Sequence, residues 1–146
     1  MRNGRVCEKE IKALVKKHGT PLVIISHSSL VEQVKKFKRL LPRVEPYYAV
    51  KANSDPNIIK TFLKLGTGFD VASKYEMDLV LKLGAKPNRI IFANPVKPPE
   101  AMRYAMQKGI DLTIFDSEYE LYKIAEHAPG ARVMVRIKSP NVGSVV

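Results

Sequence analysis

Residues 46–53 form the stretch Pro46-Tyr47-Tyr48-Ala49-Val50-Lys51-Ala52-Asn53, an aromatic and aliphatic run that ends at a lysine. Such a run is typical of a buried β-strand. Similar runs follow it at 69–72, 89–93, 112–115 and 131–137. Between successive strands lie segments with the apolar spacing of amphipathic helices, at 56–65, 75–83, 99–108 and 118–126. The chain is therefore predicted to be an α/β protein.

The predicted strands end at regular intervals. Their ends fall near Lys51, Ser73, Asn94, Asp116 and Ile137, which are 21 or 22 residues apart. Such even spacing indicates a repeated βα unit and parallel strands. An open doubly wound sheet and a closed (β/α)8 barrel both fit. Short loops and the lack of a glycine-rich nucleotide motif favour a partial TIM barrel, with about five of the eight βα units at 46–146.

A helical lead-in at 1–40 is predicted before the first unit. It has helix-like patterns at 8–18 and 30–40, with the apolar run 21–26 between them as a further candidate strand. Within the repeat, Ser73 with Glu76 and Ser117 with Glu120 have the spacing of a capping box at a helix start. An incomplete barrel leaves strand edges unpaired, so we expect another copy or another segment to cover them.

Composition narrows the class of protein. The 146 residues carry a formal net charge of +11, spread over several predicted helices. This charge suits solvated helix faces or a nucleic-acid surface, and no nucleic-acid motif accompanies it. No apolar run is long enough to span a membrane, and no secretory signal is evident. With Cys7 as its single cysteine, the protein is expected to be cytoplasmic, without nucleic-acid or membrane partners. The three histidines show no metal-binding spacing.

Polar residues at the carboxyl ends of the strands are the candidate functional groups, because active sites of barrel enzymes lie at that face. Lys51 is the sharpest candidate, since a partly desolvated lysine amine can act as a nucleophile toward a carbonyl group. A surface lysine is the alternative. Other polar residues near these ends are Asn53, Asp70, Ser73, Asn94, Lys97, Asp116, Ser117 and Arg136.

Three charged residues are expected to accompany Lys51. Asp70 lies in or just after the second strand, where aspartate is uncommon, and this favours pairing with a nearby cation. Arg136 follows a strongly apolar strand, and a buried arginine requires an anionic partner. Asp70 and Glu76 are the candidate partners, and Glu76 is also expected to cap its helix.

Several motifs resemble one enzyme family. Residues 46–53 resemble the cofactor-lysine motif of the alanine-racemase-like pyridoxal phosphate enzymes. The segments 69–76, 89–97, 115–121 and 135–137 are similar, in order and spacing, to the ornithine decarboxylase branch of that superfamily. The resemblance runs from about Gly19 to the end of the chain, and diaminopimelate decarboxylases and racemases share only its first motif.

The resemblance implies a barrel that binds pyridoxal 5'-phosphate, with Lys51 as the lysine that carries the cofactor. It implies that Asp70, Glu76 and Arg136 line or brace the cofactor side and that Ala49 packs near the ring. The implied reaction is decarboxylation of a basic amino acid, ornithine or lysine above all. The alternatives are a diaminopimelate decarboxylase or a racemase within the enzyme class, a non-catalytic regulatory homologue, and an inactive fragment. The unpaired strand edges of an incomplete barrel separately lead us to expect a homodimer or larger assembly.

In this family a glycine-rich phosphate loop, a further glutamate and a β domain contribute to the site. By the resemblance these parts lie downstream of Val146. Residues 1–146 alone are therefore expected to lack turnover.

Overall fold

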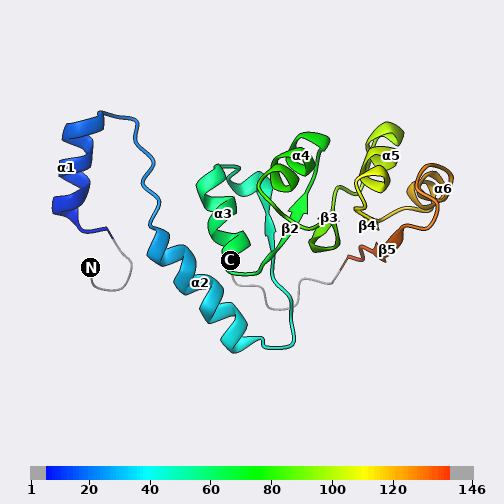
Figure 1. The fold of residues 1–146 in the computed structure, drawn as a ribbon, viewed down its shortest axis with the longest axis horizontal. Coiled ribbons are helices and arrows are strands. Elements are labelled where there is room, and N and C mark those ends of the chain that lie inside the picture. The colour runs from blue at the N-terminus through cyan, green and yellow to red at the C-terminus, as the bar shows by residue number, and fades with distance from the viewer. Residues whose placement is uncertain (1–5, 139–146) are drawn as a thin grey trace.

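The computed structural model describes residues 6–138, which form a five-stranded parallel sheet (Figure 1). The strands are hydrogen-bonded in chain order, as expected for consecutive right-handed βα units. The prediction of a parallel α/β fold is confirmed. The strand bounds are β1 Tyr47–Ala49, β2 Gly68–Val71, β3 Ile90–Phe92, β4 Leu112–Phe115 and β5 Arg132–Val135.

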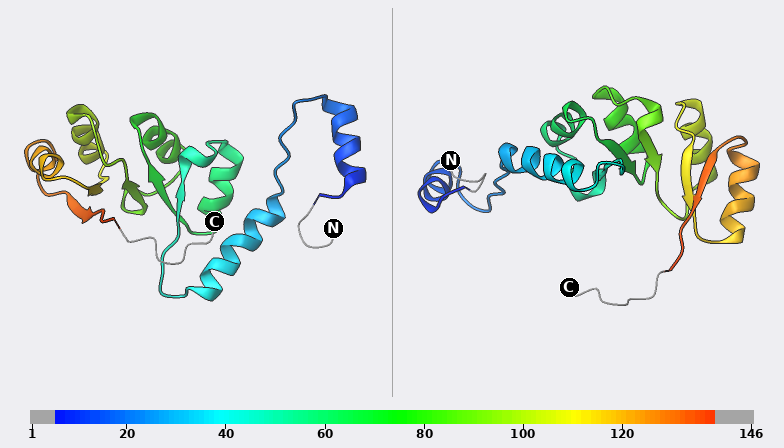
Figure 2. Two further views of the ribbon diagram at one scale, coloured as in Figure 1. Left: turned by 180° about the vertical axis from the view of Figure 1, so that it is seen from behind. Right: turned by 90° about the horizontal axis from the view of Figure 1, so that it is seen from below.

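Helices connect the strands and lie on one side of the sheet, as Figures 1 and 2 show. A sheet of parallel strands with all its crossover helices on one side has the arrangement of a barrel wall. The helices are α3 Pro56–Lys64, α4 Lys74–Lys82, α5 Pro99–Gln107 and α6 Glu118–His127, with α1 Glu8–His18 and α2 His27–Leu40 before the sheet. Two short 3-10 helices follow β1 and precede β3, at Val50–Ala52 and Pro87–Arg89.

The segment 21–26 is extended but is not a strand, so that part of the prediction is wrong. Val23 is 81% exposed, and none of the described strands pairs with this segment. In Figure 1 it runs between α1 and α2, apart from the sheet. An apolar run with strand-like alternation forms a strand only when a neighbouring backbone supplies the ladder hydrogen bonds.

The core lies between the sheet and its helices, and it is densest near β1, β2 and β3. Val50, Ile59, Phe69 and Val71 are completely buried. The Tyr48 ring stacks on Phe62, with ring centroids 4.1 Å apart. Burial of large apolar side chains on this scale is the main stabilising contribution in a domain of this size.

Gly68 allows β1 and β2 to approach closely. A Cβ atom at Gly68 would lie 2.5 Å from the Tyr47 ring, a contact that the backbone could not accommodate without moving. Because Tyr47 and Gly68 are register partners in the parallel ladder, the glycine keeps this ring against the strand. The same register pairs Ala49, two residues before Lys51, with Asp70.

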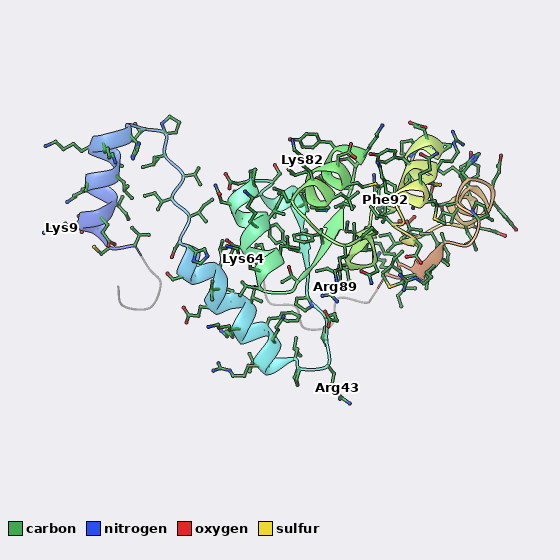
Figure 3. All side chains as sticks on the ribbon, in the orientation of Figure 1. Lys9, Arg43, Lys64, Lys82, Arg89 and Phe92 are labelled. Atoms are coloured by element: carbon green, nitrogen blue, oxygen red, sulfur yellow. The ribbon has the colours of Figure 1, made fainter. Side chains whose placement is uncertain are left out.

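Basic side chains cover the surface of the helices. In Figure 3, Lys9, Lys64 and Lys82 extend from α1, α3 and α4, and all three are exposed. This distribution agrees with the interpretation of the positive charge as solvated helix faces. No helix among residues 6–138 is long and apolar enough to cross a membrane.

The far end of the sheet has a thinner core. Met102, Ile124 and Ala128 form a small buried cluster under α5 and α6. In β5, by contrast, every residue is exposed, including Met134 at 46% and Val135 at 61%. An apolar edge strand with free backbone groups is a template for pairing with another chain.

We therefore expect residues 1–146 to self-associate through β5. Sedimentation of the purified chain should give a mass above the 16.4 kDa of one copy. Val135→Lys should shift the chain toward the monomer, because a charged side chain on an edge strand opposes pairing. Tyr75→Lys, at an exposed position of α4, is the matched control and should leave the mass unchanged. A monomeric wild-type chain would contradict the expectation.

Candidate functional site

The parallel register brings Lys51 and Asp70 to the same edge of the sheet. Ala49 at the end of β1 is the register partner of Asp70 in β2. The chain then turns through the 3-10 helix Val50–Ala52, which places Lys51 just beyond the carboxyl end of β1. Within residues 6–138, the Lys51 amine makes no hydrogen bond or ion pair, and the residue is exposed. Its amine is therefore accessible for reaction.

Asp70 is an acidic residue on which the charge of Lys51 acts. It is half-buried, and burial raises the pKa of its carboxyl above the ordinary value. The positive charge of Lys51 acts in the opposite direction, and the negative charge of Glu76 raises the pKa further. Asp70 thus lies close enough to Lys51 and Glu76 for both of their charges to act on its carboxyl.

Glu76 caps α4 in a different way from the one predicted. The Ser73 hydroxyl accepts a hydrogen bond from the Glu76 backbone N–H at 3.3 Å, as expected for the start of a helix. The Glu76 carboxylate, however, accepts from the Ala72 N–H at 2.6 Å. The carboxylate is therefore held just before the start of α4, one residue beyond the N-cap N–H that a capping-box glutamate accepts, and its charge reaches Asp70.

Ala49 and Arg136 are the two other residues predicted for the site. Ala49 is partly buried in β1. Arg136 is exposed, and its backbone N–H donates to the Phe115 carbonyl at 2.7 Å. Among residues 6–138 no ion pair joins Arg136 to Asp70 or Glu76, so the predicted pairing is not found. The physical reason is position: Arg136 follows the open edge strand β5, three strands from β2.

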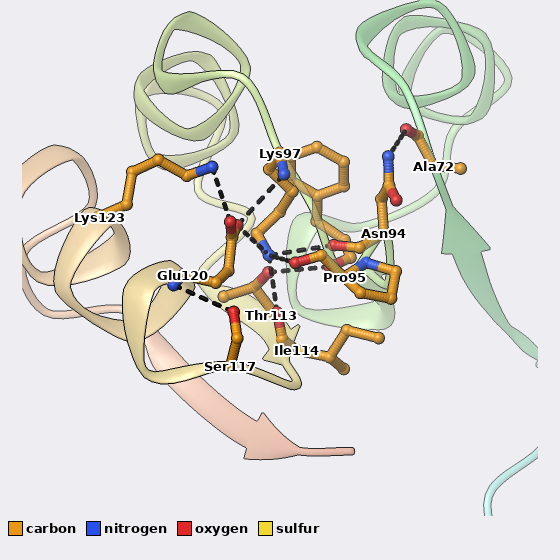
Figure 4. A network of polar contacts seen from close by, with 10 residues as sticks. Ala72, Asn94, Pro95, Lys97, Thr113, Ile114, Ser117, Glu120 and Lys123 are labelled. Carbon is orange, nitrogen blue, oxygen red and sulfur yellow. Dashed lines mark hydrogen bonds and ion pairs between the residues drawn. The ribbon is translucent and has the colours of Figure 1, made fainter. Parts of the chain in front are cut away.

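Sequence reasoning missed the role of a buried ion pair beside these residues (Figure 4). Lys97 follows β3, and its side chain is completely buried; its ammonium lies 2.9 Å from Glu120. Glu120 was predicted only to cap α6. The Ser117 hydroxyl does accept from the Glu120 N–H at 3.3 Å, but the Glu120 carboxylate turns to Lys97 and Lys123. Spacing alone gives no signal for a pair so far apart in the chain.

The site combines an accessible primary amine with two neighbouring carboxylates. Such an amine can bond covalently to a carbonyl compound, and the carboxylates can hold a cationic group beside it. No cluster of side chains suited to a metal ion occurs among residues 6–138. The Lys51 amine, with its two neighbouring carboxylates, suits an organic cofactor that carries a carbonyl group.

A family model for the pyridoxal binding domain of pyridoxal-dependent decarboxylases matches residues 27–144. Among curated relatives, Ornithine decarboxylase 2 of Drosophila melanogaster is 48% identical over 118 residues. That match covers 81% of this chain and 30% of the fly protein. A lysine/ornithine decarboxylase of Selenomonas ruminantium is 38% identical over 146 residues, covering 100% of this chain and 37% of that protein. The chain thus spans about a third of the length of these relatives.

Solved structures agree with the sequence matches. A structure described as SrLDC in complex with PLP and cadaverine superimposes with a TM-score of 0.88 at 39% identity. The superposition covers 97% of this chain and 37% of that chain. This similarity confirms the barrel-type fold and, with the family model, the cofactor class. The chain belongs to the pyridoxal-dependent decarboxylase family, and its residues 27–144 match the model of that family's pyridoxal binding domain.

Proposed function

We propose that this chain forms the cofactor-lysine side of a pyridoxal phosphate enzyme that decarboxylates L-ornithine to putrescine. The observation that carries the proposal is the accessible Lys51 amine beside the Asp70 and Glu76 carboxylates at the carboxyl end of β1 and β2. When bound, the cofactor accepts the electrons released as carbon dioxide leaves, and the protein supplies binding and orientation.

Each residue of the site has a distinct part in holding the cofactor. Lys51 provides the amine that bonds covalently to the cofactor aldehyde. Asp70 and Glu76 give the surroundings of that amine a negative charge, which favours a cationic nitrogen there. Ala49 lies on the strand that precedes Lys51 and offers a small apolar surface to the ring. Arg136 contributes a positive charge suited to an anionic group of the cofactor or substrate.

The relatives support a basic amino acid as substrate, and one observation favours ornithine. The fly relative with that name is more similar to this chain than the lysine/ornithine enzyme, at 48% against 38% identity. Lysine is the alternative substrate. We further propose a cytoplasmic enzyme of polyamine synthesis that works as a homodimer, in which the exposed β5 edge is covered. Carbon dioxide release from ornithine and from lysine, measured on the product of the full reading frame, tests the choice of substrate.

Covalent attachment of the cofactor to Lys51 is the first prediction from this proposal. Borohydride reduction in the presence of pyridoxal phosphate, followed by peptide mapping, should place the label on the peptide containing Lys51. Lys51→Ala should remove this label, because no amine remains at the strand end. Lys82→Ala, an exposed helix lysine, should leave labelling unchanged. Persistent labelling of another lysine in the Lys51→Ala variant, at wild-type yield, would contradict the proposal.

Asp70 should make stability depend on pH. Its pKa is raised in the folded chain above the unfolded value of about 3.9, so folding favours the protonated form. The resulting stability is present below that unfolded value and is lost as pH rises through the folded pKa. Asp70→Asn should therefore be more stable than wild type at pH 7, and the gain should vanish below about pH 4.

Urea denaturation at both pH values measures this difference. Asp116→Asn, at an exposed position after β4, is the control and should change stability little at either pH. A loss of stability at pH 7 in Asp70→Asn would show that the ionised carboxylate stabilises the fold.

A substitution of Arg136 tests separately whether this residue contributes to cofactor binding. Arg136→Met should weaken pyridoxal phosphate binding, because a positive charge suited to an anionic group is removed. It should cost little stability, because Arg136 is exposed. An absorbance titration with pyridoxal phosphate measures the affinity, and equal affinity in the two proteins would remove Arg136 from the site.

A further inference from the structure

Lys97 is a buried charge that the proposed site does not use directly. It lies in the loop between β3 and α5, and the residue is only 1% exposed. A buried ammonium is costly unless acceptors surround it. The contacts of Lys97 therefore show which acceptors offset the cost of burying its charge.

The Lys97 ammonium joins three segments of the chain (Figure 4). Its Nζ donates to the Ile114 carbonyl of β4 at 2.6 Å and to the Asn94 carbonyl at 3.0 Å. A longer contact reaches the Pro95 carbonyl at 3.5 Å. The Glu120 carboxylate of α6 lies 2.9 Å away and also accepts from the Lys97 backbone N–H at 3.2 Å. One side chain thus satisfies the free carbonyl groups where β3 and β4 end.

Burial and the neighbouring charges act in opposite directions on both members of this pair. Burial lowers the pKa of Lys97, and the Glu120 carboxylate opposes that effect. Burial alone would raise the pKa of Glu120, but the ammonium groups of Lys123 and Lys97 outweigh it and the pKa is lowered. Lys123 is 2.6 Å from the same carboxylate and partly exposed. Glu120 therefore has one buried and one outer cationic partner.

A chain of contacts leads from Lys97 to the Glu76 carboxylate. The Asn94 backbone carbonyl binds Lys97, and the Asn94 side chain donates to the Ala72 carbonyl at 3.5 Å. The Ala72 N–H in turn donates to the Glu76 carboxylate at 2.6 Å. Ala72 follows β2, two residues after Asp70. The peptide groups at the end of β2 are therefore held from the β3 side and from the α4 side.

We propose that Lys97 is a positioning residue of the cofactor site: through Asn94 and Ala72 it holds the Asp70 and Glu76 carboxylates in place beside Lys51. This inference rests on the proposed function of Lys51. Lys97 does not itself take up the cofactor, because its amine is enclosed by three carbonyl groups and a carboxylate. The two lysines at the strand ends thus have separate roles, one chemical and one geometric.

Two variants interrupt the contacts between Lys97, Asn94 and Ala72 at different points. Lys97→Met combined with Glu120→Met removes the pair without leaving one charge buried alone. Asn94→Ala leaves the ion pair intact and removes only the side-chain contact to Ala72. Lys123→Met is the matched control, because it removes the outer partner of Glu120 and leaves the contacts of Lys97 in place.

Two measurements on the full chain test the proposal. Titration with pyridoxal phosphate should show affinity reduced about tenfold in the double variant and in Asn94→Ala, because small displacements in a preorganised site weaken binding strongly. Hydrogen exchange should become faster in the segment 68–76 relative to α3. Lys123→Met should behave as wild type in both measurements.

The outcomes separate the two proposals. If the wild-type chain is labelled on Lys51 and both variants bind the cofactor with wild-type affinity, the positioning role is overturned and the proposed function stands. If exchange in 68–76 rises in both variants but the wild-type chain takes no label on Lys51, the proposed function fails and the structural link remains. A loss of affinity confined to the double variant, with Asn94→Ala unchanged, would also overturn the route through Asn94.

Discussion

The parallel hydrogen-bonded register of β1 and β2 is the constraint on which the rest of the structure depends. Tyr47 pairs with Gly68 and Ala49 with Asp70, so a shift by one residue would turn every side chain of β1 to the other face. The glycine accepts the Tyr47 ring where any other side chain would clash. With that register fixed, Lys51 and Asp70 reach the same edge of the sheet, and the chemistry proposed for the protein follows from their proximity.

Much of this arrangement could be predicted from the sequence because it depends on short-range patterns. The strand positions, the helix starts at Ser73 and Ser117 and the strand-end location of Lys51 all follow from periodicity and capping chemistry within one βα unit. The errors arose where a partner lies far along the chain. The segment 21–26 has strand-like residues but no ladder among the described strands, and the Glu120 carboxylate turns to Lys97, 23 residues away in the chain.

The two ends of the sheet differ in how complete they are. The β1–β3 end has a dense core and a connected set of polar contacts at its carboxyl edge. The β5 end has an exposed strand, and Arg136 lies beyond it without an acidic partner among residues 6–138. In a closed barrel each strand has two neighbours, so the position of Arg136 depends on whatever covers β5. Lys51 therefore lies beside a strand end with charged neighbours, whereas Arg136 is exposed beyond an edge strand.

The central claim is that the strand-end amine of Lys51, beside the Asp70 and Glu76 carboxylates, is the attachment point of pyridoxal phosphate. The most direct measurement is a crystal structure of the protein grown with this cofactor. The account predicts electron density that is continuous from the Lys51 Nζ atom into the cofactor, with Lys97 still enclosed by its carbonyl groups. Density joined to a different lysine, or a cofactor bound away from the carboxyl ends of β1 and β2, would contradict it.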